Sequence, residues 1–246
     1  MLRRLRALGV RCLVHDPLLG DAAPPEEASF TDVLAADVVS LHVPLTREGV
    51  HATHHLIGTR ELLTLREDAL LINAARGAVV DNGALRDVLS VRSRLRAALD
   101  VWEGEPLPDR ALQARVLIGT PHIAGYAWDG KLRGARQVFE ALAAFAGVAI
   151  DADATAGLAA SPAGDLHAGC CTCWQDAVLA CYDPRRDDAG LRAATLDEEH
   201  TVRAAAFDRL RRDYPQRREF SAWRIGTAVP GDSVRYRELL AAGFSA

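Results

Sequence analysis

The sequence predicts an α/β protein with a doubly wound parallel sheet, followed by a small α+β domain. In the first part of the chain, short continuous apolar runs alternate with segments of helical periodicity. That alternation is typical of parallel strands covered by helices on both faces. The pattern changes after about residue 150, so we expect one domain over residues 1–150 and a second over residues 151–246.

The apolar runs of the first domain predict strands, and the segments between them predict helices. Strands are expected at Arg11–His15, Asp37–Val43, Ala69–Asn73, Leu95–Val101 and Val116–Ile118. Helices are expected at Met1–Gly9, Phe30–Ala36, Thr59–Arg66, Asn82–Arg92 and Trp128–Ala146.

The second domain begins after a segment rich in Ala, Gly and Asp, residues 148–168, which predicts a linker or irregular entry. Helices are expected at Trp174–Tyr182, Asp197–Tyr214 and Ser233–Ala242, and a strand at Ser221–Ala228.

Composition and charge exclude several classes of protein. The formal net charge of -4 gives no reason to expect nucleic acid or an anionic membrane as a partner. No run approaches the roughly 18 to 20 apolar residues of a membrane helix. Met1–Val10 is basic and amphipathic and lacks the features of a secretory signal, so we expect a cytoplasmic protein.

Three polar residues each follow a predicted strand. Arg76 follows the strand that ends at Asn73, Glu105 follows the next one, and His122 follows the last. Because ligands of open α/β sheets bind at the carboxyl ends of the strands, we expect these side chains to converge there.

Asp16 directly follows the predicted strand Arg11–His15. In dinucleotide-binding units, an acid at the tip of the second strand binds the adenosine ribose, about 20 residues after a glycine-rich turn. Counting back that far runs off the front of this chain, and no Gly-x-Gly-x-x-Gly occurs in it. The interpretation is a dinucleotide-binding domain whose first strand and glycine turn are missing. The alternative is that Asp16-Pro17 is a turn at the end of a strand.

The strand-end segments resemble the signatures of the D-2-hydroxyacid dehydrogenase family. The patterns are N-A-x-R-G, D-V-x-x-x-E-P and P-H-x-A-G, at Asn73–Gly77, Asp100–Pro106 and Pro121–Gly125. The resemblance implies a Rossmann-like NAD-binding domain. It also implies His122 as the catalytic base, Glu105 as its partner and Arg76 as the ligand of the substrate carboxylate.

Further residues are assigned to NAD and substrate by the same resemblance. The expected cofactor-binding residues are Asp16, Val43, Ala75, Arg76, Asp100 and Gly125, and the expected substrate-binding residues are Arg76 and Tyr126. A carboxylate at Asp16 repels the extra phosphate of NADP, which favours NAD.

A narrower resemblance points to the branch of the family that oxidises 4-phospho-D-erythronate at C2 in vitamin B6 biosynthesis. The matching segments include His42–Thr46, Val101–Pro106, His122–Tyr126, Tyr182–Asp188 and Phe207–Glu219. It implies a homodimer formed through the C-terminal domain. Without the glycine turn, the chain is expected to bind NAD poorly and to be nearly inactive. The alternatives are an inactive fragment that serves only in dimerisation, and an NAD-sensing corepressor without enzymatic activity.

Two clusters invite a metal hypothesis, and we expect neither to be a metal site. Cys170 and Cys173 form a C-x-x-C with no second pair to complete a structural zinc site. His51, His54 and His55 have no carboxylate or cysteine nearby in sequence, which favours exposed loop residues.

Overall fold

The computed structural model describes residues 1–150, 162–166, 173–227, 229–231 and 233–246. These residues form two compact units, and neither unit is continuous in sequence. The sheet unit comprises Leu13–Ala124 and Pro184–Tyr214, and the terminal unit comprises Met1–Cys12, Gly125–Asp183 and Pro215–Ala246. This division differs from the expected boundary near residue 150.

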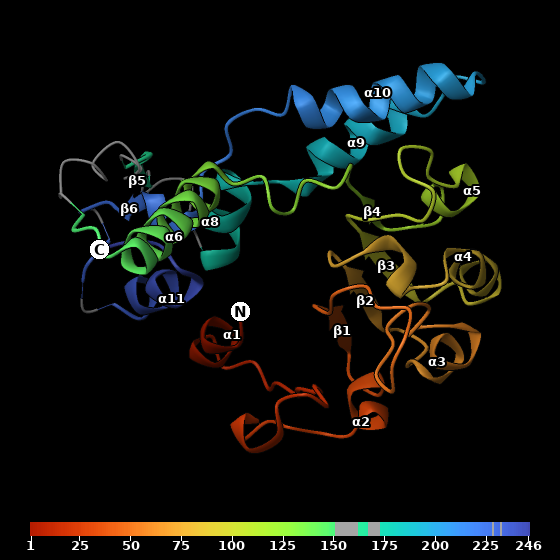
Figure 1. The fold of residues 1–246 in the computed structure, drawn as a ribbon, viewed down its shortest axis with the longest axis horizontal. Coiled ribbons are helices and arrows are strands. Elements are labelled where there is room, and N and C mark those ends of the chain that lie inside the picture. The colour runs from red at the N-terminus through yellow and green to blue at the C-terminus, as the bar shows by residue number, and fades with distance from the viewer. Residues whose placement is uncertain (151–161, 167–172, 228, 232) are drawn as a thin grey trace. The chain divides into compact units, whose positions relative to one another are not determined.

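The sheet unit is built on four parallel strands (Figure 1). They are β1 (Val38–Leu41), β2 (Leu70–Asn73), β3 (Arg96–Leu99) and β4 (Ile118–Gly119), and they neighbour one another in chain order. The last residues of the strands are in register, since Leu41 pairs with Asn73, Asn73 with Leu99, and Leu99 with Gly119. The predicted α/β fold with a parallel sheet is confirmed.

Short helices precede and connect these strands, and a polar side chain begins most of them. They are α2 (Phe30–Leu34), α3 (Thr59–Thr64), α4 (Asn82–Val91) and α5 (Arg110–Gln113). Ser29, Asp81 and Asp109 cap α2, α4 and α5 by accepting hydrogen bonds from backbone N–H groups of the first turn. Right-handed crossovers between sequential parallel strands place α3, α4 and α5 on one face of the sheet (Figure 1).

Two helices from the C-terminal part of the sequence complete the core of the sheet unit. They are α9 (Pro184–Ala194) and α10 (His200–Arg212), and their Leu191 and Phe207 are fully buried in the same cluster as the strand residues. Asp188 on α9 accepts a hydrogen bond from the backbone N–H of Gly119 on β4 at 2.8 Å. These contacts explain why the units do not follow a single boundary along the chain.

The prediction of a strand at Arg11–His15 is wrong. Within this segment only Val14 forms a bridge, with Glu27. Its N–H donates to the carbonyl of Glu26, and its carbonyl accepts from the N–H of Ala28. The segment therefore pairs with residues 26–28 over a single position and does not join β1.

The terminal unit combines helices with a two-stranded parallel sheet. Its helices are α1 (Leu2–Ala7), α6 (Trp128–Ala146), α8 (Trp174–Cys181) and α11 (Val234–Ala242), and its strands are β5 (Gly164–Leu166) and β6 (Trp223–Ile225). Leu166, Ile225, Leu239 and Phe244 lie in its buried core. The terminal unit also has a short 3-10 helix at Phe220–Ala222, and the sheet unit has 3-10 helices at Gly20–Ala22 and Gly77–Val79. In the described part of the chain, no helix has the length and apolar character needed to cross a membrane.

Candidate active site at the carboxyl ends of the strands

The sheet register places the predicted catalytic residues at one edge. Arg76 follows the last residue of β2 by three positions, and His122 follows the last residue of β4 by three. Glu105 lies in the turn after β3, the strand between them. All three belong to the sheet unit.

His122 and Glu105 form a direct pair. The Nδ1 atom of His122 lies 2.8 Å from Oε2 of Glu105, and the two side chains are 32% and 21% exposed. The other carboxylate oxygen, Oε1, accepts a hydrogen bond from the backbone N–H of Trp102 at 2.8 Å. With a carboxylate accepting at Nδ1, the neutral ring carries its proton there and leaves the Nε2 lone pair available.

The backbone around His122 is held by Asp100. His122 has a φ of 57°, in the left-handed region that residues other than glycine seldom adopt. The Asp100 carboxylate accepts hydrogen bonds from Thr120 Oγ1 at 2.6 Å, Ile123 N at 2.8 Å and Ala124 N at 2.9 Å. The Asp100 carbonyl also accepts from the His122 N–H at 2.7 Å. Asp100 therefore positions the His122 loop, and its expected contact with the nicotinamide carboxamide stays a prediction.

Arg76 presents an exposed guanidinium. Its Nη1 donates to the carbonyl of Ala75 at 2.7 Å. Among the described residues, no carboxylate forms an ion pair with it. The charge of Arg76 is therefore available for an anionic ligand.

Gly77 brings the Arg76 loop against the turn that contains Glu105. A methyl group at Gly77 would overlap the carbonyl carbon and oxygen of Trp102 and crowd the N–H of Glu103. Only glycine permits this approach of one backbone to another. The loops after β2 and β3 are thus packed backbone to backbone.

A buried asparagine fixes the course of the Arg76 loop. Asn73 is fully buried; its Oδ1 accepts from the N–H of Ala75 at 3.1 Å, and its Nδ2 donates to the carbonyl of Arg76 at 2.9 Å. The Asn residue of the N-A-x-R-G pattern is therefore a structural residue, and sequence reasoning assigned it no role.

The other predicted cofactor residues of the sheet unit are Asp16, Val43 and Ala75. Asp16 is half-buried, and its Oδ1 accepts from the N–H of Leu18 at 3.0 Å. Val43 packs against the core, and Ala75 is buried. These contacts do not test the cofactor-binding roles of the three residues, and each role stays a prediction.

Gly125 and Tyr126 belong to the terminal unit. Gly125 is exposed, and Lys131 Nζ lies 4.2 Å from the centre of the Tyr126 ring. The structure does not group these two residues with Arg76, Glu105 and His122, so their roles also stay predictions.

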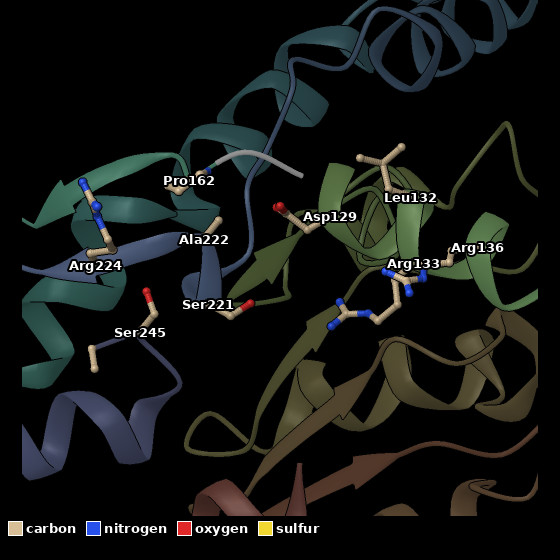
Figure 2. Close-up of a pocket in the computed structure, with 10 residues that line it drawn as sticks. Asp129, Leu132, Arg133, Arg136, Pro162, Ser221, Ala222, Arg224 and Ser245 are labelled. Carbon is tan, nitrogen blue, oxygen red and sulfur yellow. The ribbon is translucent and has the colours of Figure 1, made fainter. Parts of the chain in front are cut away.

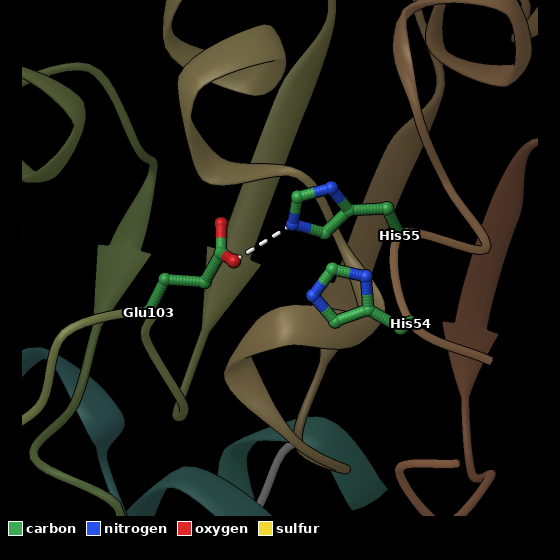
Figure 3. Close-up of side chains that lie close together, drawn as sticks. All are labelled: His54, His55 and Glu103. Atoms are coloured by element: carbon green, nitrogen blue, oxygen red, sulfur yellow. Dashed lines mark hydrogen bonds and ion pairs between the residues drawn. The ribbon is translucent and has the colours of Figure 1, made fainter. Parts of the chain in front are cut away.

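Sequence reasoning missed Glu103, which connects three loops beside the site (Figure 3). Its Oε1 lies 2.8 Å from Nε2 of His55, and its Oε2 accepts from the N–H of Asn82 at 2.8 Å. His54 and His55 lie in a loop as expected, but the prediction that they are exposed is wrong, since both are partly buried. Glu103 is 48 positions away from His55, and no local pattern could pair them. Cys170, of the C-x-x-C, lies outside the described residues.

A pocket of about 370 Å³ lies within the terminal unit, between α6 and β6 (Figure 2). Its lining includes Arg133, Arg136 and Arg224. Each of these arginines pairs with a carboxylate, respectively Glu219, Glu140 and Asp165. None of the predicted catalytic or cofactor residues lines this pocket.

Comparison with known proteins agrees with the strand-end motifs. Residues 1–124 match the family model described as the NAD binding domain of D-isomer specific 2-hydroxyacid dehydrogenase. Residues 172–243 match a model described as a domain of unknown function, DUF3410.

Curated relatives match the chain over nearly its whole length. The erythronate-4-phosphate dehydrogenase of Pseudomonas paraeruginosa is 45% identical over 97% of this chain. That of Azotobacter vinelandii is 46% identical over 97% of this chain. The chain spans 64% and 63% of the length of these two relatives.

Proposed function

Since the chain belongs to the D-isomer specific 2-hydroxyacid dehydrogenase family, we propose that it serves the oxidation of a 2-hydroxy acid with NAD. The observation that carries this proposal is the His122–Glu105 pair, 2.8 Å apart, at the same sheet edge as the Arg76 loop. Bound NAD would accept the hydride that leaves C2 of the substrate.

His122 is proposed to accept the proton of the C2 hydroxyl at Nε2. An alcohol that loses hydride must also lose its hydroxyl proton, and imidazole is a suitable base near neutral pH. The imidazolium that forms would be stabilised by the Glu105 carboxylate at Nδ1. Because Trp102 N–H holds the other oxygen of Glu105, the acid stays aligned with the ring.

Arg76 is proposed to bind the substrate carboxylate. A guanidinium can donate two parallel hydrogen bonds to one carboxylate, which fixes the orientation of the substrate. Arg76 is exposed, and its guanidinium donates a hydrogen bond to the backbone carbonyl of Ala75, so a ligand need not displace an acid from it.

The residues of this chain fit part of an NAD molecule. Asp16 is half-buried and its Oδ1 accepts from the N–H of Leu18, so its second oxygen could accept from a ribose hydroxyl. Val43, Ala75 and Asp100 would lie toward the nicotinamide end. The 246 residues contain no Gly-x-Gly-x-x-Gly, so no phosphate cradle of that type is assigned within them.

We propose 4-phospho-D-erythronate as the substrate, which places the protein in vitamin B6 biosynthesis. The support is the name of the relatives at 45% and 46% identity. Homodimerisation through residues 151–246 belongs to the same proposal, and its test is the solution mass from light scattering.

The test is NADH formation from 4-phospho-D-erythronate, with D-lactate as a control substrate. It uses two proteins: this chain, and a joined protein in which the chain is extended by the part of the Azotobacter vinelandii relative that it does not span. We expect the joined protein to oxidise 4-phospho-D-erythronate in preference to D-lactate. Failure of the joined protein to form NADH, with its fold intact by circular dichroism, would contradict the proposal.

A further inference from the structure

Three side chains with metal-ligating atoms lie together beside the turn after β3. They are His54, His55 and Glu103, and one ligand atom of each lies within 4.8 Å of the others. Figure 3 shows the His55 ring directed toward the Glu103 carboxylate, with His54 stacked against it. The ring centres of the two histidines are 4.1 Å apart with planes at 18°. The proposed reaction uses none of these three residues.

We propose that His54, His55 and Glu103 form a binding site for a divalent transition metal ion of the zinc type. Two imidazoles and one carboxylate are a donor set found in zinc sites that keep one position for water. Imidazole suits zinc, copper and nickel, whereas magnesium and calcium favour sites built of oxygen ligands. All three side chains are partly exposed, so a hydrated ion can reach them and water can complete the coordination.

Groups outside the cluster act on two of the three ligands. Asn82 N–H donates to Oε2 of Glu103 at 2.8 Å, which leaves Oε1 on the side of His55. The Nδ1 atom of His55 lies 3.6 Å from Oδ2 of Asp81, just beyond hydrogen-bond distance. A carboxylate near the far nitrogen of a ligating histidine increases the basicity of the ring.

Ion binding requires the three ligands to rearrange. With bonds of roughly 2.0 to 2.1 Å, tetrahedral ligands lie about 3.3 Å apart, whereas the three ligand atoms now lie within 4.8 Å of one another. His55 and Glu103, 2.8 Å apart, must separate slightly to admit the ion, and His54 must approach them. A rotation of its partly exposed side chain would bring its nitrogen toward the other two.

His54 and His55 would bind the ion as neutral imidazoles. Metal binding displaces protons from histidine, so affinity falls when the pH drops below the ordinary histidine range.

The test is titration of the chelator-treated chain with Zn²⁺ by calorimetry and with Co²⁺ by visible absorption. We expect one ion per chain and an intense tetrahedral cobalt spectrum. His54→Ala and Glu103→Gln should each weaken binding at least about tenfold. His51→Ala, in the same loop but outside the cluster, is the matched control and should leave the affinity unchanged.

Asp81→Asn tests the outer contact. Asparagine keeps the cap of α4, so the fold should persist, while loss of the carboxylate should weaken metal affinity about tenfold. Thermal unfolding with and without Zn²⁺ gives a second readout, since an ion that binds only the folded state raises the Tm. If Glu103→Gln does not fold, the Zn²⁺ affinity of His54→Ala decides whether the cluster binds the ion.

The C-x-x-C at Cys170 and Cys173 offers a competing site, so a double Cys→Ser variant is included. We expect it to bind the ion as the unchanged chain does. The proposal is overturned if no ion binds, if His54→Ala binds with unchanged affinity, or if the double Cys→Ser variant loses binding.

Discussion

Two regions of the molecule present arginine side chains, one at the strand ends and three in the pocket of the terminal unit, and they differ in how the positive charge is matched. At the carboxyl ends of the strands, Arg76 is exposed and forms no ion pair with the described carboxylates. In the pocket of the terminal unit, Arg133, Arg136 and Arg224 each pair with an acid.

The difference shows that the number of arginines in a region does not predict an anion-binding site, because arginines that are paired with carboxylates are already neutralised. An anion entering the pocket must compete with a carboxylate that is already paired, whereas an anion reaching Arg76 meets an unneutralised guanidinium. We therefore expect carboxylate ligands to bind at the strand ends rather than in the pocket of the terminal unit.

Replacement of His122 should have the largest effect, because it removes the proposed base next to Arg76. In the joined protein, His122→Asn should lower the rate of NADH formation by about 10²- to 10⁴-fold, the range for loss of a general base. The control is His51→Ala, which should leave the rate unchanged. An active His122→Asn variant would remove the chemical role assigned to this region.

Replacing one arginine of each region with leucine tests whether the anion binds at the strand ends or in the pocket. Arg76→Leu should weaken binding of oxalate, a two-carbon mimic of a 2-oxo acid, about a hundredfold, since charge-assisted hydrogen bonds contribute about 1.5–3 kcal/mol each. Arg224→Leu should leave oxalate affinity unchanged, because the Arg224 charge is matched by Asp165. Calorimetry measures both. If Arg224→Leu lost oxalate affinity and Arg76→Leu did not, the anion would bind in the pocket.

A methyl group at Gly77 should disturb the strand-end region without removing any functional group. Gly77→Ala would push the Arg76 loop from Trp102, and a displacement of about 1 Å can cost about a hundredfold in rate. We expect a loss of ten- to a hundredfold in the joined protein. Gly134→Ala on α6 is the matched control, since no atom lies within 4 Å of its added methyl. It should raise the free energy of unfolding by about 0.5–1 kcal/mol.

The smallest effect concerns the ion pair between Arg218 and Asp129 in the terminal unit. Burial alone would raise the pKa of Asp129, but hydrogen bonds from Arg218 and from Glu219 N–H outweigh it and lower the pKa below 3.8. The stability from this pair is fully present above the ordinary pKa of 3.8 and is lost as the pH falls below it.

Asp129→Asn should therefore cost on the order of 1 kcal/mol near neutral pH and less in acid, measured by urea unfolding. Equal losses at both pH values would show that the pair contributes no pH-dependent stability.

The sequence predicted the elements that carry strong local signals. The predicted helix Trp128–Ala146 agrees residue for residue with α6, and the predicted strands Ala69–Asn73 and Leu95–Val101 contain β2 and β3. The family motifs located Arg76, Glu105 and His122, because each lies within a few residues of a strand end.

Features that depend on contacts between distant residues could not be predicted. A short apolar run predicted a strand at Arg11–His15, but a strand also needs a partner, and only Val14 forms a bridge. The assignment of α9 and α10 to the sheet unit depends on burial of Leu191 and Phe207 against the strands. The His55–Glu103 pair spans 48 positions, and neither residue has a local signature.

The most direct test of the proposed dehydrogenase site is transfer of deuterium from 4-phospho-D-erythronate labelled at C2. In the joined protein, we predict that mass spectrometry finds the deuterium in the reduced cofactor, and that the double variant Arg76→Leu/His122→Asn forms no labelled cofactor. Reduced cofactor without the label, or equal labelling by the double variant, would contradict the assignment of this region as the active site.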